Sequence, residues 1–144
     1  MSTAPQVRLH HLALTVTDLD ESVRWYEAVF GLACKMDAPH EGGVGKVLAD
    51  ETWELMIVLH RHDANAGELF AEQVTGLDHA GFAVAARADL EAWQHHLEAH
   101  GVIRSETADK PLTQSAIADE TYGSVLVFRD PDNIQLEFFA PPSH

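Results

Sequence analysis

The stretch LHHLALTV at residues 9–16 decides the fold, because a near copy of it, LDHAGFAV, occurs at residues 77–84. A shift of 68 positions places one stretch on the other and brings His11 onto His79. Both stretches are short and mainly apolar, which is typical of strands. An aliphatic side chain would pack better at either histidine position. The matched pair therefore indicates a duplicated module in which the histidine has a role.

Each copy of the strand is followed by a predicted helix. Residues 17–32, TDLDESVRWYEAVFGL, have apolar residues at helical spacing, with Thr17 or Asp18 as the N-cap and a glycine as the stop. Residues 86–101, ARADLEAWQHHLEAHG, show the same pattern and end at Gly101. The same shift of 68 positions relates one tryptophan in each helix. The duplication therefore extends beyond the strand.

Further short apolar stretches predict the remaining strands. They are LACKM (32–36), VGKVLAD (44–50) and WELMIVLH (53–60) in the first half, and VIRSE (102–106), AIADE (116–120), SVLVFRD (124–130) and NIQLEFFA (133–140) in the second. The sequence thus predicts an α+β fold, in which two βαβββ modules form a cupped, eight-stranded mixed sheet with the helices outside. The modules span about residues 7–62 and about 76–141 of a single domain. A linker at about 63–75 and a loop, TADKPLTQ (107–114), are expected from their polar composition.

The composition restricts the class of protein and its partners. With 46% hydrophobic and 22% charged residues, the chain has the composition of a globular protein. A formal net charge of -14 would repel nucleic acid and anionic membranes. The sequence shows no signal peptide and no apolar run long enough to span a bilayer. The single cysteine, Cys34, forms no internal disulfide and is expected to be buried, so we expect a cytoplasmic protein.

Three of the predicted strands combine an apolar face with a smaller, more polar one, because side chains alternate along a strand. The polar face carries His11 in the first strand, His79 in its copy and Glu137 in the last strand. Two imidazoles and one carboxylate are a ligand set that holds a divalent metal ion and leaves positions open. Each residue taken alone would be read as a solvated strand residue. Their matched positions in a repeat favour the metal site.

The chain resembles the vicinal oxygen chelate (VOC) superfamily over essentially all of its length, from Leu9 to Pro141. The resemblance rests on four motifs: H-x-A-L-x-V-x-D-L, the helix that ends in F-G-L, the second H-x-x-F-x-V, and the closing F-R-D-P-D-N-x-x-L-E. In that family the corresponding positions bind the metal, which implies His11, His79 and Glu137 as ligands. Iron(II) or manganese(II) is favoured, and zinc, nickel or cobalt fits the same set.

The resemblance implies a metal-dependent enzyme whose small-molecule substrate chelates the ion through two vicinal oxygens. Three protein ligands with open positions are typical of non-haem iron(II) enzymes, which favours a dioxygenase-like reaction. A glyoxalase-like lyase or epimerase is the alternative enzyme. A drug- or metabolite-binding protein of the bleomycin-resistance type is the alternative without catalysis. Short two-module chains of this family commonly pair, so a homodimer is expected, with the ligands of one site from one subunit or from two.

Glyoxalase I has a fourth protein ligand, a glutamate, on the strand that corresponds to WELMIVLH. That position falls here at about Met56 or Val58, neither of which binds a hard ion well. The four-ligand chemistry is therefore less favoured. Glu54 or His60 would supply the fourth ligand if the register differs by two.

Two further residues are candidates for catalysis. His60 lies near the predicted metal site and is a candidate proton carrier. Together with His62 on the same face it also suggests a second metal site, with solvent-facing histidines as the alternative. Tyr122 precedes a glycine and is a candidate hydroxyl donor to a substrate, with a packed loop tyrosine as the alternative.

Overall fold

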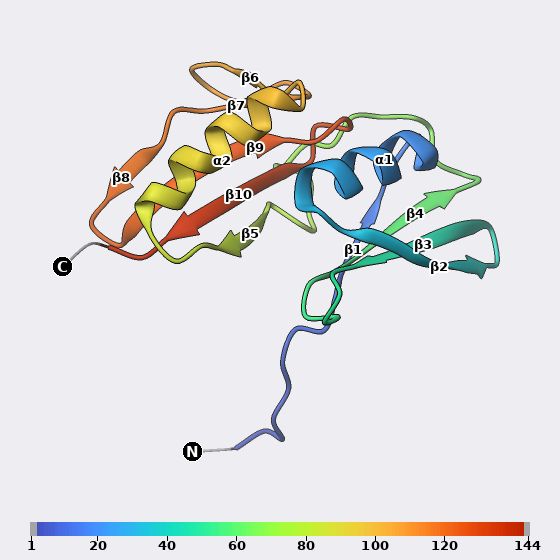
Figure 1. The fold of residues 1–144 in the computed structure, drawn as a ribbon. Coiled ribbons are helices and arrows are strands. Elements are labelled where there is room, and N and C mark those ends of the chain that lie inside the picture. The colour runs from blue at the N-terminus through green and yellow to red at the C-terminus, as the bar shows by residue number, and fades with distance from the viewer. Residues whose placement is uncertain (1–2, 143–144) are drawn as a thin grey trace. The chain divides into compact units, whose positions relative to one another are not determined.

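The computed structural model describes residues 3–142, and the chain divides into two compact units, Met1–Ala66 and Gly67–His144. Within the described residues each unit contains one helix and one sheet, which can be followed in Figure 1. Among residues 3–142 we find no helix with the length and apolar composition that a membrane crossing requires.

The first unit is a four-stranded sheet with one helix. Its elements are β1 (Leu12–Thr15), α1 (Leu19–Phe30), β2 (Ala33–His40), β3 (Gly43–Ala49) and β4 (Met56–His62). The strand order is β1-β4-β3-β2, in which β1 runs parallel to β4 and the other neighbours are antiparallel. This is the predicted βαβββ connection.

The ends of α1 follow from the residues that the sequence indicates. The side chain of Asp18 accepts a hydrogen bond from the backbone N–H of Glu21 at 3.1 Å and so caps the helix. Gly31 ends it in the left-handed conformation (φ 68°), which glycine adopts without the steric cost of a side chain. Tyr26 of α1 and Ile57 of β4 are both fully buried, so the core of this unit lies between the helix and one face of the sheet.

The second unit repeats the arrangement and extends it. Its elements are β5 (Ala80–Ala83), α2 (Arg87–Ala99), β6 (Ile103–Arg104), β7 (Thr113–Gln114), β8 (Ala118–Glu120), β9 (Gly123–Arg129) and β10 (Gln135–Ala140). The strand order is β5-β10-β9-β7-β6, and β8 also pairs with β9. Strand β5 runs parallel to β10, as β1 does to β4. The predicted α+β fold with two βαβββ modules is confirmed, with the strands in mixed sheets of four and six.

Helix α2 covers β9 and β10, as Figure 1 shows. Leu90 and Leu97 are fully buried, and the ring of Trp93 stacks on Phe138 with 4.1 Å between the ring centroids. The predicted loop at 107–114 ends in the short strand β7. The side-chain amide of Gln114, which is fully buried, donates to two backbone carbonyls and anchors this addition.

Two local expectations about the first unit are wrong. Strand β4 begins three residues later than the predicted stretch 53–60, because the Asp50 carboxylate accepts a hydrogen bond from the backbone N–H of Glu54 at 2.9 Å and closes a turn. Trp53 lies in that turn with a φ of 60°. Cys34 is exposed, because it lies on the outer strand β2.

The connection expected at about 63–75 is partly fastened to the second unit by an ion pair. Arg129, only 3% exposed, donates two hydrogen bonds to the Glu72 carboxylate, at 2.9 and 3.1 Å, and one to the carbonyl of Ala108. These hydrogen bonds from the guanidinium hold the pKa of Glu72 down at about 2. The chain from Gly67 onward therefore belongs to the second unit.

Candidate metal centre

The carboxylate of Glu137 lies where its neighbouring strand leaves room for it. In the sheet, Glu137 of β10 pairs with Gly81 of β5. A Cβ at position 81 would lie 3.2 Å from Oε1 of Glu137, so a glycine here keeps the space of the carboxylate open. Leu136 and Phe138 on either side are buried toward the core. The alternation of the strand therefore directs Glu137 to the opposite face.

His79 directly precedes β5 and uses both of its ring nitrogens. Its Nδ1 lies 2.7 Å from Oδ1 of Asp78, and its Nε2 lies 3.3 Å from Oε1 of Glu137. The hydrogen bond to Asp78 raises the pKa of His79; burial opposes the rise and Glu137 adds to it. In the neutral ring, donation of Nδ1–H to Asp78 leaves the lone pair on Nε2, which points at Glu137.

This pair of side chains fits a divalent metal ion. Ligand bonds of about 2.0–2.2 Å place two adjacent ligand atoms about 3.0–3.4 Å apart, and Nε2 of His79 and Oε1 of Glu137 are 3.3 Å apart. A metal-binding histidine usually donates its other ring N–H to a carboxylate or carbonyl, which fixes the tautomer and the ring. Asp78 is such a carboxylate. The sequence did not single it out, although it directly precedes His79.

His11, the third predicted ligand, belongs to the first unit, at the residue before β1. Its side chain is exposed, and its Nδ1 lies 2.9 Å from Nδ1 of His10. The second unit thus brings two of the predicted ligands together, and the first unit presents the third at the matched position of the repeat. A metal-binding role for His11 stays a prediction.

The first unit has a valine where the second unit has its carboxylate. Glu137 pairs with Gly81, and the matched residue of β1, Ala13, pairs with Val58. The register therefore selects Val58, rather than Met56, as the counterpart of Glu137. A valine side chain has no atom that could bind a metal ion.

Glu54 and His60, the two candidates for a fourth ligand, lie on either side of that position. Glu54 is exposed in the turn before β4. His60 pairs with Thr15, four residues further along β1 than His11. Burial lowers the pKa of His60, and the neighbouring histidines lower it further, so the ring is neutral at neutral pH.

Tyr122 lies on the Glu137 side of the second sheet. Its ring stacks on Phe139 with 6.3 Å between centroids and 3° between planes, and it is 62% exposed. Phe139 follows Glu137 by two residues on β10, so the two side chains share a face. The tyrosine is therefore a surface residue beside the candidate centre, and its predicted catalytic role stays a prediction.

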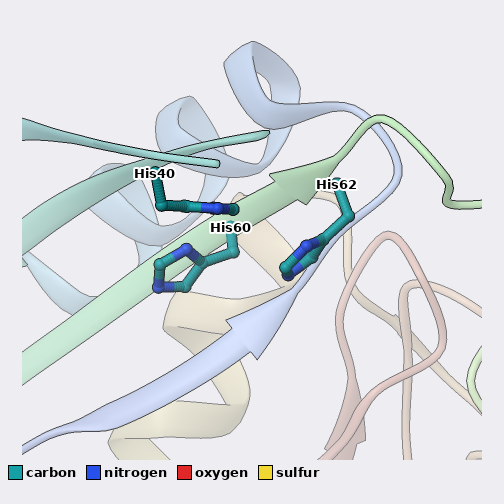
Figure 2. A group of neighbouring side chains, drawn as sticks. All are labelled: His40, His60 and His62. Carbon is teal, nitrogen blue, oxygen red and sulfur yellow. The ribbon is translucent and has the colours of Figure 1, made fainter. Parts of the chain in front are cut away.

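A cluster of three histidines lies in the first unit. Figure 2 shows His60 and His62 on β4 with their rings turned toward the ring of His40 from β2. The sequence places His60 and His62 on one face but gives no sign of His40. His40 comes near the other two histidines only through the pairing of β2 with β3, and a sequence pattern does not specify that pairing.

The family follows from a comparison with known proteins. A model of the Glyoxalase/Bleomycin resistance protein/Dioxygenase superfamily matches residues 8–138. The chain therefore belongs to this superfamily, as its motifs predict. No curated protein matches the sequence.

Solved structures share the fold. A glyoxylase/bleomycin resistance protein/dioxygenase domain from Frankia sp. EAN1pec is 29% identical, with a TM-score of 0.81 over 96% of this chain and 95% of that one. The fosfomycin resistance protein FosX from Listeria monocytogenes, complexed with Mn(II) and sulfate, is 17% identical, with a TM-score of 0.63 over 96% and 95%. A glyoxalase family protein from Enterococcus faecalis is 15% identical, with a TM-score of 0.69 over 92% and 96%.

Proposed function

We propose that the protein is a metal-dependent enzyme whose divalent ion, iron(II) or manganese(II), is held by His11, His79 and Glu137. The observation that carries the proposal is the line of side chains from Asp78 through His79 to Glu137, in which Nε2 and Oε1 lie 3.3 Å apart. The Mn(II) bound by the Listeria protein of the same fold supports an ion of this kind.

The reaction that the ligand set favours is dioxygenase-like, on a small molecule with two adjacent oxygen atoms. When bound, the ion supplies Lewis-acid polarisation of those oxygens. Val58 stands at the position that corresponds to Glu137 and offers no fourth ligand. A centre with open positions is favoured over the four-ligand centre of a glyoxalase-like lyase for that reason.

The residues of the second unit have separate tasks in this proposal. Asp78 holds the proton on Nδ1 of His79 and so keeps Nε2 available as a ligand. Glu137 supplies the one negative charge of the set, so the centre keeps a net positive charge toward an anionic substrate oxygen. Tyr122, whose exposed ring stacks on Phe139, is the proposed donor of a hydroxyl to a bound substrate. We assign His60 no step in this reaction.

We also propose that the protein is a homodimer. The three ligands come from both units, so a site is completed either within one chain or across two. A His11→Ala chain and a Glu137→Ala chain are each inactive in this proposal. In mixed dimers, activity returns only if His11 of one chain completes the site of the other.

The proposal is tested by anaerobic purification of the untagged chain, metal analysis, and an oxygen-uptake screen with catechols and other enediols. We expect iron or manganese near one ion per chain and oxygen uptake with at least one chelating substrate, both lost in Glu137→Ala. Metal without oxygen uptake, but with isomerisation or lyase activity, would favour the glyoxalase-like alternative. A chain that binds neither ion would overturn the metal centre and favour a binding protein of the bleomycin-resistance type.

A further inference from the structure

The histidine cluster of the first unit contains none of the three ligands of the centre proposed above. We propose that His40, His60 and His62 form a second metal site, which binds one zinc-like divalent ion through three imidazoles. One nitrogen atom from each ring lies within 4.8 Å of the other two. Figure 2 shows the three rings arranged around one point beside β4.

The pairing of three strands brings these residues together. His40 of β2 and His62 of β4 both pair with Gly43 of β3, one from each side, so the three residues form one row across the sheet. His60 pairs with Gly45 in the next row on the same face. The central strand thus carries a glycine in both rows that the histidines flank.

The two glycines let the imidazoles lean over the central strand. A Cβ at position 45 would lie 2.7 Å from Cε1 and 2.8 Å from Nδ1 of His60. A Cβ at position 43 would overlap the backbone oxygen of Arg61 and would also lie 2.7 Å from Cε1 of His40. Side chains at either position would therefore occupy the space of the rings. With glycine there, the ring centroid of His40 lies 5.0 Å from that of His60 and 5.0 Å from that of His62.

Two ring nitrogens in the cluster are buried without a hydrogen-bond partner among residues 3–142. They are Nε2 of His40 and Nδ1 of His60. The other nitrogen of His40, Nδ1, lies 3.0 Å from the backbone carbonyl of Glu41. Donation to that carbonyl places the lone pair of His40 on the buried Nε2, which is how a metal-binding histidine is usually held. Buried polar atoms are nearly always satisfied, and a metal ion would satisfy both.

The geometry requires only small adjustments to hold zinc. Bonds of about 2.0–2.1 Å to a tetrahedral ion place two nitrogen ligands about 3.3–3.4 Å apart. The three nitrogens already lie within 4.8 Å of one another, and rotation of the rings, above all of the exposed His62, would bring them to this spacing. Three neutral imidazoles suit zinc or cobalt better than magnesium or calcium, which prefer oxygen ligands. A cavity of about 320 Å³, lined by the three histidines and residues 13–15, leaves the fourth position open to a water or anion.

The second site uses none of the three residues of the first. His60 pairs with Thr15, which follows His11 by four residues in the chain, so the row of His60 is distinct from the position of His11.

The test is a titration of the untagged, full-length Glu137→Ala chain with Zn(II) and with Co(II), because this background disables the first proposed centre. We expect one ion per chain, and with Co(II) the intense visible absorption of a four-coordinate ion. In the same background, His62→Ala should weaken binding by at least about tenfold and abolish the absorption, since even residues that only support a ligand contribute about 10- to 100-fold. Gly45→Ala should weaken binding as well, because its methyl group displaces the His60 ring.

The matched control is His95→Gln, which removes an exposed histidine of α2 and should leave Zn(II) and Co(II) binding unchanged. Circular dichroism of each variant identifies loss of fold; His62 is exposed, so its variant retains the fold. Equal affinity of the His62→Ala and parent chains would overturn the proposal. So would a weak, six-coordinate Co(II) spectrum, which would show that the ion binds to scattered surface groups.

Discussion

The two modules have the same strand framework but different residues beside the matched histidines. In the second module, the strand that follows His79 pairs Gly81 with Glu137. In the first, the matched position pairs Ala13 with Val58. Two substitutions on the framework, of the carboxylate and of the glycine beside it, therefore separate a site with a carboxylate from one without it.

Two residues further along β4 and β10, the first module has the polar side chain and the second has the apolar one. The first module has His60 beside Gly45, and the second has Phe139 beside Val125. Phe139 fills its row with an aromatic ring stacked on Tyr122, where the first module has a group of imidazoles. After duplication, polar chemistry is kept in one row of each module and the other row is apolar. The identity of the central-strand residue, glycine or valine, decides which rings fit.

The largest expected effect is a loss of metal affinity when Glu137 of the second module is replaced by valine, the residue at the matched position of the first. Glu137→Val removes the only carboxylate of the proposed centre and should weaken iron(II) or manganese(II) binding by more than about 100-fold, since residues that only support a ligand already contribute 10- to 100-fold. Metal-dependent activity should fall with it. The measurement is equilibrium dialysis with metal analysis. Val58→Ala, the matched change in the first module, should leave metal affinity unchanged; wild-type affinity in Glu137→Val would refute the comparison.

A smaller loss of metal affinity is expected when the residue that contacts each matched histidine, Asp78 or His10, is replaced. Asp78→Asn leaves His79 in place but removes the carboxylate that holds its Nδ1–H, and metal affinity should fall by about 10- to 100-fold. His10, the neighbour of His11, is not a carboxylate, and His10→Gln should change affinity by less than about tenfold. The same dialysis measures both. If His10→Gln had the larger effect, the first module would be the better ordered half of the centre.

The third prediction compares ion pairs. Glu72→Gln in the second unit should destabilise the protein by about 1 kcal/mol at neutral pH, a value reduced because the Glu72 side chain is partly open to water. The pKa of Glu72 is lowered from 4.5 to about 2, so the ion pair contributes fully above pH 4.5 and is lost as the pH falls toward 2. Urea unfolding should therefore show a difference between the two proteins that shrinks over this range. A difference that is constant with pH would mean that the ionised carboxylate is not its source.

The smallest effect is expected from the corresponding surface pair of the first module. Lys46 lies 2.7 Å from Asp37, but both groups are open to water, which screens their attraction. Asp37→Asn should leave the midpoint of urea unfolding unchanged within error at physiological salt. A clear shift would show that β2 depends on this contact more than its exposure indicates.

Much of the fold could be predicted from the sequence because its signals are local. The offset between the two strand copies, the Asp18 cap and the alternation around Glu137 each depend on residues close together in the chain. The polar face of β10 followed from that alternation, and the buried positions of both helices followed from the helical spacing of their apolar residues. His79 is predicted from its match with His11 and Glu137 from the polar face of its strand, and the second unit brings the two side chains to 3.3 Å.

The features that could not be predicted depend on pairing between distant residues. His40 reaches His62 only through the register on both sides of Gly43. The strands β6 and β7 depend on the buried amide of Gln114, whose partners lie 12 and 20 residues away. In both cases a contact across the fold outweighs a local pattern. The late start of β4 has a local cause instead, because the hydrogen bond between Asp50 and Glu54 competes with the strand.

The outer strand β2 has a further consequence, for aggregation. An unpaired strand edge can template the addition of strands from other chains. This edge carries Lys35, whose charge disfavours burial under an added strand, and Pro39, which lacks the N–H that a new ladder would need. The same strand that presents His40 to the histidine cluster is thus a poor template for amyloid-like growth, and replacing Pro39 or Lys35 by an apolar residue would remove part of that protection.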